Sequence, residues 1–294
     1  MIEPLKLKLE VWRMEYRTST VEQIREFSRY LREEERETAT IDKYSRDVKD
    51  FFIWLKDREI SRERMGEWRG YLLQAGRKPV TINGKLSALN KFLSFLGRND
   101  CRIKYLKIQR RLFRSTEKQL SKQEYIRLME TAHSLGRERL ALLMETICAT
   151  GIRVSEVKYI TAEAIRAGRT EIALKGKIRT ILLPGKLCRK LKKYAGKRKI
   201  VSGEVFLTRN GKGMSRRQIW AEMKSLCEKA GVAPSKVFPH NLRHLFAQTF
   251  YRVCRDVAKL ADVLGHSSIE TTRLYLISTE AEHVRQMERM GLIC

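Results

Sequence analysis

The sequence predicts a mainly α-helical chain with one small β-hairpin, an α+β arrangement divided into two domains. Apolar residues recur at helical spacing along most of the chain, whereas one segment near residue 175 shows short β-rich runs. Periodicity fades only once, between Arg98 and Lys118. With 294 residues, 43% of them hydrophobic, the chain is long enough to bury two separate cores.

Four helices are predicted in the first hundred residues. They begin at Thr20, at Thr40, near Met65 and near Thr81. The first helix has an apolar face formed by Val21, Ile24, Phe27 and Leu31. The second carries an apolar stripe from Ile41 to Leu55, and the aromatic residues in these stripes are expected to fill the core of the first domain.

The weakly periodic segment is crowded with basic residues and is interpreted as a linker. The predicted division is a helical domain over residues 1–110, a basic linker over 111–118 and a second domain over 119–294.

The second domain begins with a helix start and contains the hairpin. Ser121 and Glu124 have the spacing of a capping box. Residues 170–184 form two β-rich runs that flank Lys175, Gly176 and Lys177, which indicates a hairpin with its turn at these three residues. The remainder is predicted to be mostly helical.

Electric charge is the strongest compositional signal. The chain has 61 Lys and Arg against 34 Asp and Glu, a net charge of +27 at pH 7. Residues 1–60 hold 13 basic and 14 acidic side chains, residues 61–120 hold 15 and 4, and residues 121–294 hold 33 and 16. Self-repulsion on this scale favours a polyanionic partner, met from about Arg62 onward. A solvated basic surface without such a partner is the alternative that charge alone leaves open.

Several other classes are disfavoured. The six cysteines are scattered without a CxxC pair, so neither a disulfide framework nor a zinc site is expected, and no metal or cofactor is predicted. The longest apolar stretches, such as Leu140–Met144, are too short to span a membrane, and no apolar signal segment follows Met1. A cytoplasmic protein with no membrane partner is therefore expected.

Four segments of the second domain stand out together. They are TGIRVSEV around Arg153, the hairpin with Lys175, PHNLRH with His240 and Arg243, and GHSSIETTRLY with His266 and Tyr275. His240 and Arg243 are three residues apart and share one face of a helix. His266 precedes Tyr275 by nine residues, which places His266 at a helix entrance and Tyr275 about two turns in.

These segments resemble the tyrosine recombinase family, which includes Xer proteins and phage- and transposon-type integrases. The likeness covers residues 119–294, with six matched positions in the family's order and spacing. The first domain is similar, through TIDKY at 40–44 and TINGKLSAL at 81–89, to the family's helical core-binding domain. The resemblance implies a C-shaped clamp in which this domain and a catalytic domain close around double-stranded DNA.

The resemblance also implies roles in strand cleavage. Arg153 and Arg243 would hold the non-bridging phosphate oxygens, because planar guanidiniums bind them in a bidentate way without a metal. Glu156 is expected to orient Arg153. Tyr275 would attack the phosphorus and form a 3′-phosphotyrosine, which keeps the bond energy for rejoining through a Holliday junction. Which group deprotonates Tyr275 is left open.

Three further residues would handle protons and the phosphate. Lys175 would protonate the leaving 5′ oxygen, His240 would assist near the nucleophile, and His266 would hydrogen-bond the scissile phosphate. Lys177 lies on the same hairpin and is the alternative to Lys175, which is favoured because it precedes the turn glycine. His244 is expected to pack structurally.

The last segment, Thr279–Cys294, carries apolar residues beyond the nucleophile helix. In the family such a tail docks on a neighbouring protomer, so self-association is expected: a monomer in solution and a tetramer on two DNA sites. Packing of the tail on its own chain is the alternative.

Rival functions are a type IB topoisomerase, which uses the same chemistry on one duplex, and a DNA-binding protein without catalysis. The six matched positions argue against a pure binder, and the short basic chain with GHSS favours a recombinase. No cluster of acids accompanies the motif, which disfavours a metal-dependent nuclease. Without an additional amino-terminal domain the chain resembles Xer proteins, whereas KGKIR resembles mobile-element integrases, so chromosome-dimer resolution and element integration both stay open.

Overall fold

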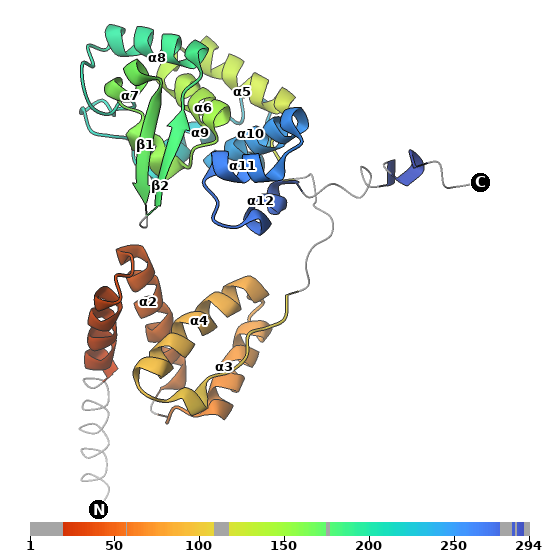
Figure 1. The fold of residues 1–294 in the computed structure, drawn as a ribbon. Helices are drawn as coiled ribbons and strands as arrows, with labels where there is room; N and C mark the ends of the chain where they lie inside the picture. Colours follow the sequence, from red (N-terminus) through yellow and green to blue (C-terminus); the bar gives the residue numbers. More distant parts are fainter. Residues whose placement is uncertain are drawn as a thin grey trace, which may run out of the picture. The chain divides into compact units, whose positions relative to one another are not determined.

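The computed structural model describes residues 20–56, 58–108, 118–174, 177–276, 284–285 and 287–290. The chain divides into two compact units, residues 1–110 and 111–294 (Figure 1). Both units are mainly helical in their described parts, and the second contains a two-stranded antiparallel sheet. The predicted fold class is therefore confirmed. Of the predicted linker, 111–118, only Lys118 lies within the described residues.

The amino-terminal unit is a small set of packed helices. Residues 20–33 are helical, followed by α2 (Thr38–Leu55), α3 (Arg62–Gln74), α4 (Pro79–Phe95) and the 3-10 helix η1 (Asn99–Cys101). Ser61 caps α3 by accepting a hydrogen bond from the Arg64 amide. Pro79 occupies the first turn of α4, where a backbone N–H would have no helical partner.

The predicted apolar stripes meet in one core. Phe27, Phe51, Trp68 and Phe92 are at most 1% exposed, so the aromatic residues fill the core as predicted. Val21 was wrongly placed in the apolar face: it is 52% exposed, and the stripe of the first helix begins only at Ile24.

The second unit contains the hairpin and most of the helices. Its elements in chain order are α5 (Lys122–Ser134), α6 (Glu138–Thr150), η2 (Val154–Tyr159), α7 (Ala162–Ala167), β1 (Arg169–Leu174), β2 (Lys177–Leu182), α8 (Gly185–Lys197), α9 (Arg216–Lys224), η3 (Pro234–Lys236), α10 (Pro239–Cys254), α11 (Val257–Leu264) and α12 (Ile269–Leu276). The predicted capping box of Ser121 and Glu124 is present at the start of α5. The two strands pair from Arg169 opposite Leu182 to Leu174 opposite Lys177.

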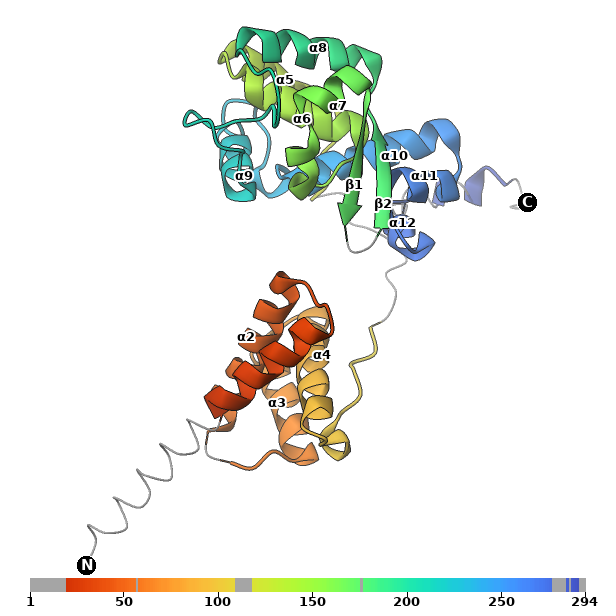
Figure 2. The same ribbon diagram turned by 60° about the vertical axis from the view of Figure 1, so that its left-hand side comes forward.

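Helix α6 is the centre of this unit. It packs against α5, α8, α9 and α10 and buries most of its residues from Leu140 to Thr150. The two threonines of this buried helix, Thr146 and Thr150, donate their hydroxyl protons to carbonyls one turn earlier, so no buried hydroxyl is left unsatisfied there. Helices α10, α11 and α12 form a second packed group around Leu260, Leu264 and Tyr275 (Figure 2).

Within the described ranges, no helix has both the length and the apolar composition needed to cross a bilayer.

Candidate active site

Gly151 ends α6 and sets the position of Arg153. Its backbone is left-handed, with φ +66°, and an added Cβ would lie 2.4 Å from the Phe246 ring, so glycine is required here. Two residues later, Arg153 lies at the start of η2 with its side chain 41% exposed. Glu156, 1% exposed, accepts from the Arg153 amide at 2.7 Å and from Arg153 Nη1 at 3.0 Å. Glu156 therefore orients Arg153, as predicted.

Arg243 is a buried guanidinium held by main-chain carbonyls. It lies on α10 and is 2% exposed. Its Nη1 donates to Gly151 O at 2.5 Å, and its Nη2 donates to Leu264 O at 2.8 Å and to His266 Nε2 at 2.9 Å. Burial, and next the nearby charge of Arg153, lower the pKa of Arg243 to about 10, so it stays protonated at neutral pH.

His266 has a defined protonation state in this arrangement. Arginine can only donate, so the Nε2 that faces Arg243 accepts and carries no proton. The ring proton then lies on Nδ1, which donates to the Thr272 hydroxyl at 2.8 Å. Burial, followed by the charges of Arg243, Arg153 and Arg179, lowers the pKa of His266 to about 4. His266 is therefore neutral near pH 7.

Tyr275 lies beside Arg243 and is surrounded by histidine rings. It is the seventh residue of α12 and is 7% exposed, and its phenol lies close enough to the Arg243 guanidinium to interact with it electrostatically. The His266 ring stacks on it, with centroids 5.6 Å apart and planes inclined by 23°. The packing of Tyr275 against α11 fixes the phenol at the edge of the basic cluster.

Two histidines of α10 approach the same tyrosine. The His240 ring lies 5.6 Å from the Tyr275 ring and belongs to an exposed residue, whereas His244 lies nearer, at 4.7 Å, and is 4% exposed. Sequence reasoning treated His244 as packing and His240 as reactive. The structure brings both to Tyr275.

Arg179 is the site residue that sequence reasoning missed. This β2 residue donates from Nη2 to Glu156 Oε2 at 2.8 Å and from Nη1 to Leu264 O, the carbonyl that also binds Arg243. Burial lowers the pKa of Arg179, and Glu156 opposes this shift. Strand alternation places Arg179 on the same inward face as Ile181, but alternation alone does not mark a charged residue there as part of a site, and the more apolar Ile178 is 75% exposed.

Part of the predicted site lies outside the described residues. This applies to Lys175 and Gly176, and Lys177 is described only as the first backbone position of β2. The described strands end at this turn. Of the predicted catalytic residues, Arg153, His240, Arg243, His266 and Tyr275 gather at one site.

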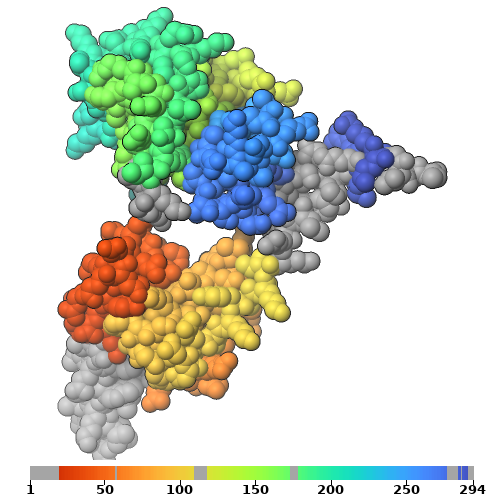
Figure 3. All heavy atoms as spheres, in the orientation of Figure 1, coloured from red at the N-terminus to blue at the C-terminus, as the bar shows by residue number. Residues whose placement is uncertain are grey.

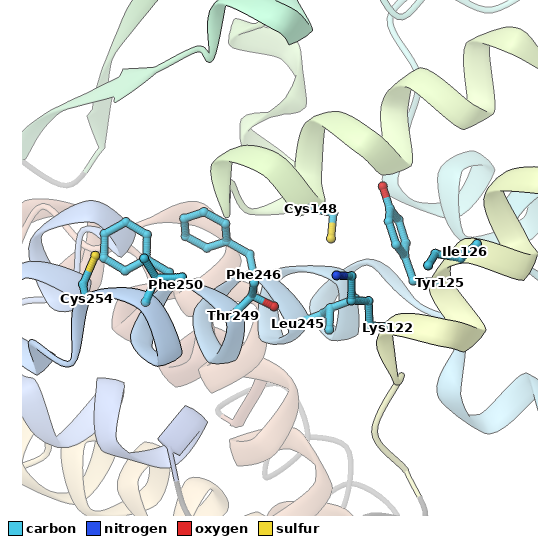
Figure 4. Close-up of a pocket in the computed structure, with 10 residues that line it drawn as sticks. Lys122, Tyr125, Ile126, Cys148, Leu245, Phe246, Thr249, Phe250 and Cys254 are labelled. Atoms are coloured by element: carbon cyan, nitrogen blue, oxygen red, sulfur yellow. The ribbon is translucent and has the colours of Figure 1, made fainter.

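An apolar cavity of about 390 Å³ lies elsewhere on the same unit (Figure 4). It is bounded by α5, α6 and the second half of α10, with Tyr125, Cys148 and Phe250 among its lining residues. None of the predicted catalytic residues lines it, so the candidate chemistry belongs to the polar cluster and not to this cavity.

Comparison with known proteins gives the family. Residues 118–282, more than half of the chain, match the phage integrase family, and residues 24–100 match the N-terminal SAM-like domain of phage integrases. The chain therefore belongs to the phage integrase family, which confirms the resemblance drawn from the sequence.

The relatives are tyrosine recombinases. Tyrosine recombinase XerA of Thermococcus kodakarensis is 28% identical over 277 residues, covering 91% of this chain and 94% of the relative. Tyrosine recombinase XerD of Staphylococcus saprophyticus is 29% identical over 272 residues, covering 84% and 90%. In fold, the chain is similar to a lambda integrase tetramer bound to a Holliday junction, with a TM-score of 0.69, 17% identity, and coverage of 86% of this chain and 76% of that one. The family match and these relatives confirm the prediction that the chain is an enzyme of the tyrosine recombinase type.

We predict that the His266 ring remains neutral at pH 6 and titrates near pH 4, measured by NMR of histidine ring protons and assigned by their loss in His266→Gln. Unfolded, this histidine takes its proton near pH 6.5, so its contribution to folding is complete above that pH and is lost as the pH falls through 4. His266→Gln should therefore flatten the fall in unfolding free energy across this window. A ring that titrates near pH 6.5 in the native protein would contradict the described contacts.

Proposed function

We propose that this chain is a site-specific DNA recombinase that cleaves and rejoins DNA strands with Tyr275 as nucleophile. The observation that carries the proposal is the Tyr275 phenol next to Arg243, in a cluster of three guanidiniums and one buried carboxylate. That cluster has an excess of positive charge suited to a phosphodiester. Membership of the phage integrase family supports the same proposed function.

In the proposed reaction the Tyr275 hydroxyl gives up its proton, with His240 assisting, and its oxygen attacks the scissile phosphorus. The bond to the 5′ oxygen breaks, the phosphate remains on the enzyme as a 3′-phosphotyrosine, and the 5′ oxygen leaves as a hydroxyl after accepting a proton from Lys175. A 5′ hydroxyl from the exchange partner then reverses these steps, so no external energy source is needed. Two such exchanges, through a Holliday junction, complete recombination.

The contacts of Arg243 indicate what DNA binding must change. Its Nη2 donates both to Leu264 O and to His266 Nε2, so a phosphate oxygen would replace His266 as the acceptor. For His266 to donate to the same phosphate, its proton must reside on Nε2, which reverses the direction of the Nδ1 contact so that the Thr272 hydroxyl donates to Nδ1. Arg153, more exposed, is free of such competition for part of its guanidinium.

Double-stranded DNA and other copies of this chain are the proposed partners. We propose that both units contact the duplex, the first as the core-binding domain, and that four protomers assemble on two sites. The tail of residues 279–294 would join neighbours. In its described part, Val284, Met287 and Met290 are about half exposed or more, which supports such a role.

A type IB topoisomerase remains the second candidate, because the same tyrosine chemistry would serve it. Scoring recombinant products separates the two: a recombinase exchanges partners between two sites, whereas a topoisomerase only relaxes supercoils.

We predict that the native chain, incubated in EDTA with sheared DNA of its source genome, forms protein–DNA adducts that survive detergent. Tyr275→Phe should form none yet bind DNA with nearly unchanged affinity, because only the phenolic oxygen is lost. Tyr251→Phe, on α10 of the same unit, is the control and should form adducts normally. Adducts in the Tyr275→Phe protein would move the nucleophile elsewhere. Sequencing of the trapped DNA gives the target used below.

Lys175 and Lys177 are separated by a change in the leaving group. A bridging 5′-phosphorothioate leaves without protonation, so Lys175→Ala should cleave normal DNA very slowly and recover on the phosphorothioate. Lys177→Ala should show a mild loss on both substrates that shrinks at low salt. The reverse pattern, with rescue confined to Lys177→Ala, would place the general acid after the turn glycine. Single-turnover cleavage of the two substrates provides the measurement.

A further inference from the structure

Helix α8 presents a dense basic face to solvent. Between Gly185 and Lys199 the chain has eight Lys or Arg and no acidic residue. Its other side is committed to the core, where Leu187, Leu191 and Tyr194 are at most 3% exposed. Because the core fixes the helix, the cationic side chains stand on a rigid support about 20 Å long.

Only part of this charge is neutralised within the described unit. Lys190 and Lys197 pair with Glu145 and Glu138 of α6, at 2.6 and 3.2 Å, along the seam between the two helices. The remaining four cations of the helix itself have no ion pair to any described carboxylate within 4.0 Å, and all are exposed: Lys186, Arg189, Lys192 and Lys193. At spacings of three and four residues these like charges repel each other along one face.

The face is remote from the candidate active site. Figures 1 and 2 place α8 at one end of the second unit and α12, which carries Tyr275, at the other, with α6 between them. Figure 3 shows the α8 segment as an outer rim of the unit. DNA held at the cluster of Arg243 and Tyr275 therefore does not account for the charge on α8.

The chemistry of the face selects among anionic partners. A membrane surface is disfavoured because the apolar residues of α8 are already buried and none is left to insert. Single-stranded nucleic acid is disfavoured because Tyr194, the sole aromatic residue of α8, is 3% exposed and offers no stacking platform. A duplex matches best, since it presents a regular row of phosphates to a rigid row of cations, one charge per ~1.7 Å of its axis.

We propose that α8 is a second duplex-DNA contact, which binds a DNA segment other than the one at the active site, through its phosphates and without regard to sequence. This goes beyond strand exchange at one site: each chain would hold two segments of DNA. The contact does not depend on Tyr275 or on the proposed cleavage.

The test uses the full chain and a variant that carries Lys186→Gln, Arg189→Gln, Lys192→Gln and Lys193→Gln. The control, with the same change in net charge, carries Lys229→Gln, Arg252→Gln, Arg255→Gln and Lys259→Gln, which are exposed positions off α8. Short duplexes without the target are titrated at low salt. The native chain and the control should bind two duplexes each and the α8 variant one. In the α8 variant the affinity of the second duplex should fall about tenfold or more. The slope of log K against log salt for that duplex should be shallower by about 0.9 per lost phosphate contact.

A photo-crosslinking residue at position 189 locates the contact directly and should label duplex DNA in the otherwise native chain.

Two results would overturn the proposal. An equal loss of second-duplex binding in the control variant would show an effect of bulk charge, and an absence of crosslinks at position 189 would show that the duplex does not lie on α8. Capture of phosphatidylglycerol vesicles or single-stranded RNA in preference to duplex would also overturn it. The α8 variant should still form covalent adducts with target DNA. If the native protein forms no adducts, the proposed cleavage fails, and the binding test of α8 is unaffected.

Discussion

Two main-chain carbonyls and one arginine organise the candidate site. Gly151 and Leu264 lie at the carboxyl ends of α6 and α11, where carbonyls lack helical partners and carry the negative end of the helix dipole. Arg243 donates to both, so a single guanidinium caps two helices that are far apart in sequence. This explains how a 2% exposed cation is tolerated although, among the described residues, Glu156 is the one buried carboxylate of the cluster. It also fixes the loop that carries His266 and the turn between α6 and η2 that carries Arg153.

The rest of the cluster follows from that arrangement. The residues that end α6 and α11 must both be glycine. Gly151 makes room for Phe246, and an added Cβ on Gly265, with φ +63°, would lie 2.3 Å from Arg179 Cδ. Through this gap Arg179 reaches Leu264 O and Glu156, and Glu156 in turn orients Arg153. Three guanidiniums are thus brought together before any phosphate arrives. Burial, together with the charge of these guanidiniums, keeps His266 neutral, so the positive charge that would meet an anion comes from the three arginines.

The sequence predicted the helices, the hairpin and the segments that meet at the site, because periodicity and capping are local properties. It did not identify Arg179, since a charged residue on the inward face of a short strand is understood only once its partners, Glu156 and Leu264 O, are in place. The nearness of His244 to Tyr275 was missed for the same reason: it depends on how α12 packs against α10. The exposure of Val21 shows the limit of periodicity near a helix end, where a stripe can extend past the core it faces.

The central claim is that the arginine cluster acts on the charge of the transition state and not on DNA affinity. Arg153→Ala tests it most directly, because this side chain is 41% exposed and Glu156 would keep its contacts with the residue 153 amide and with Arg179. Lys158→Ala, at an exposed basic residue of the 3-10 helix η2 that follows Arg153, is the control. In single-turnover reactions on the recovered target, Arg153→Ala should form the covalent adduct about 10²–10³-fold more slowly while its Kd for DNA changes little, and Lys158→Ala should change neither rate nor Kd appreciably. A parallel fall of adduct rate and affinity in Arg153→Ala would contradict the account and make Arg153 an ordinary phosphate contact.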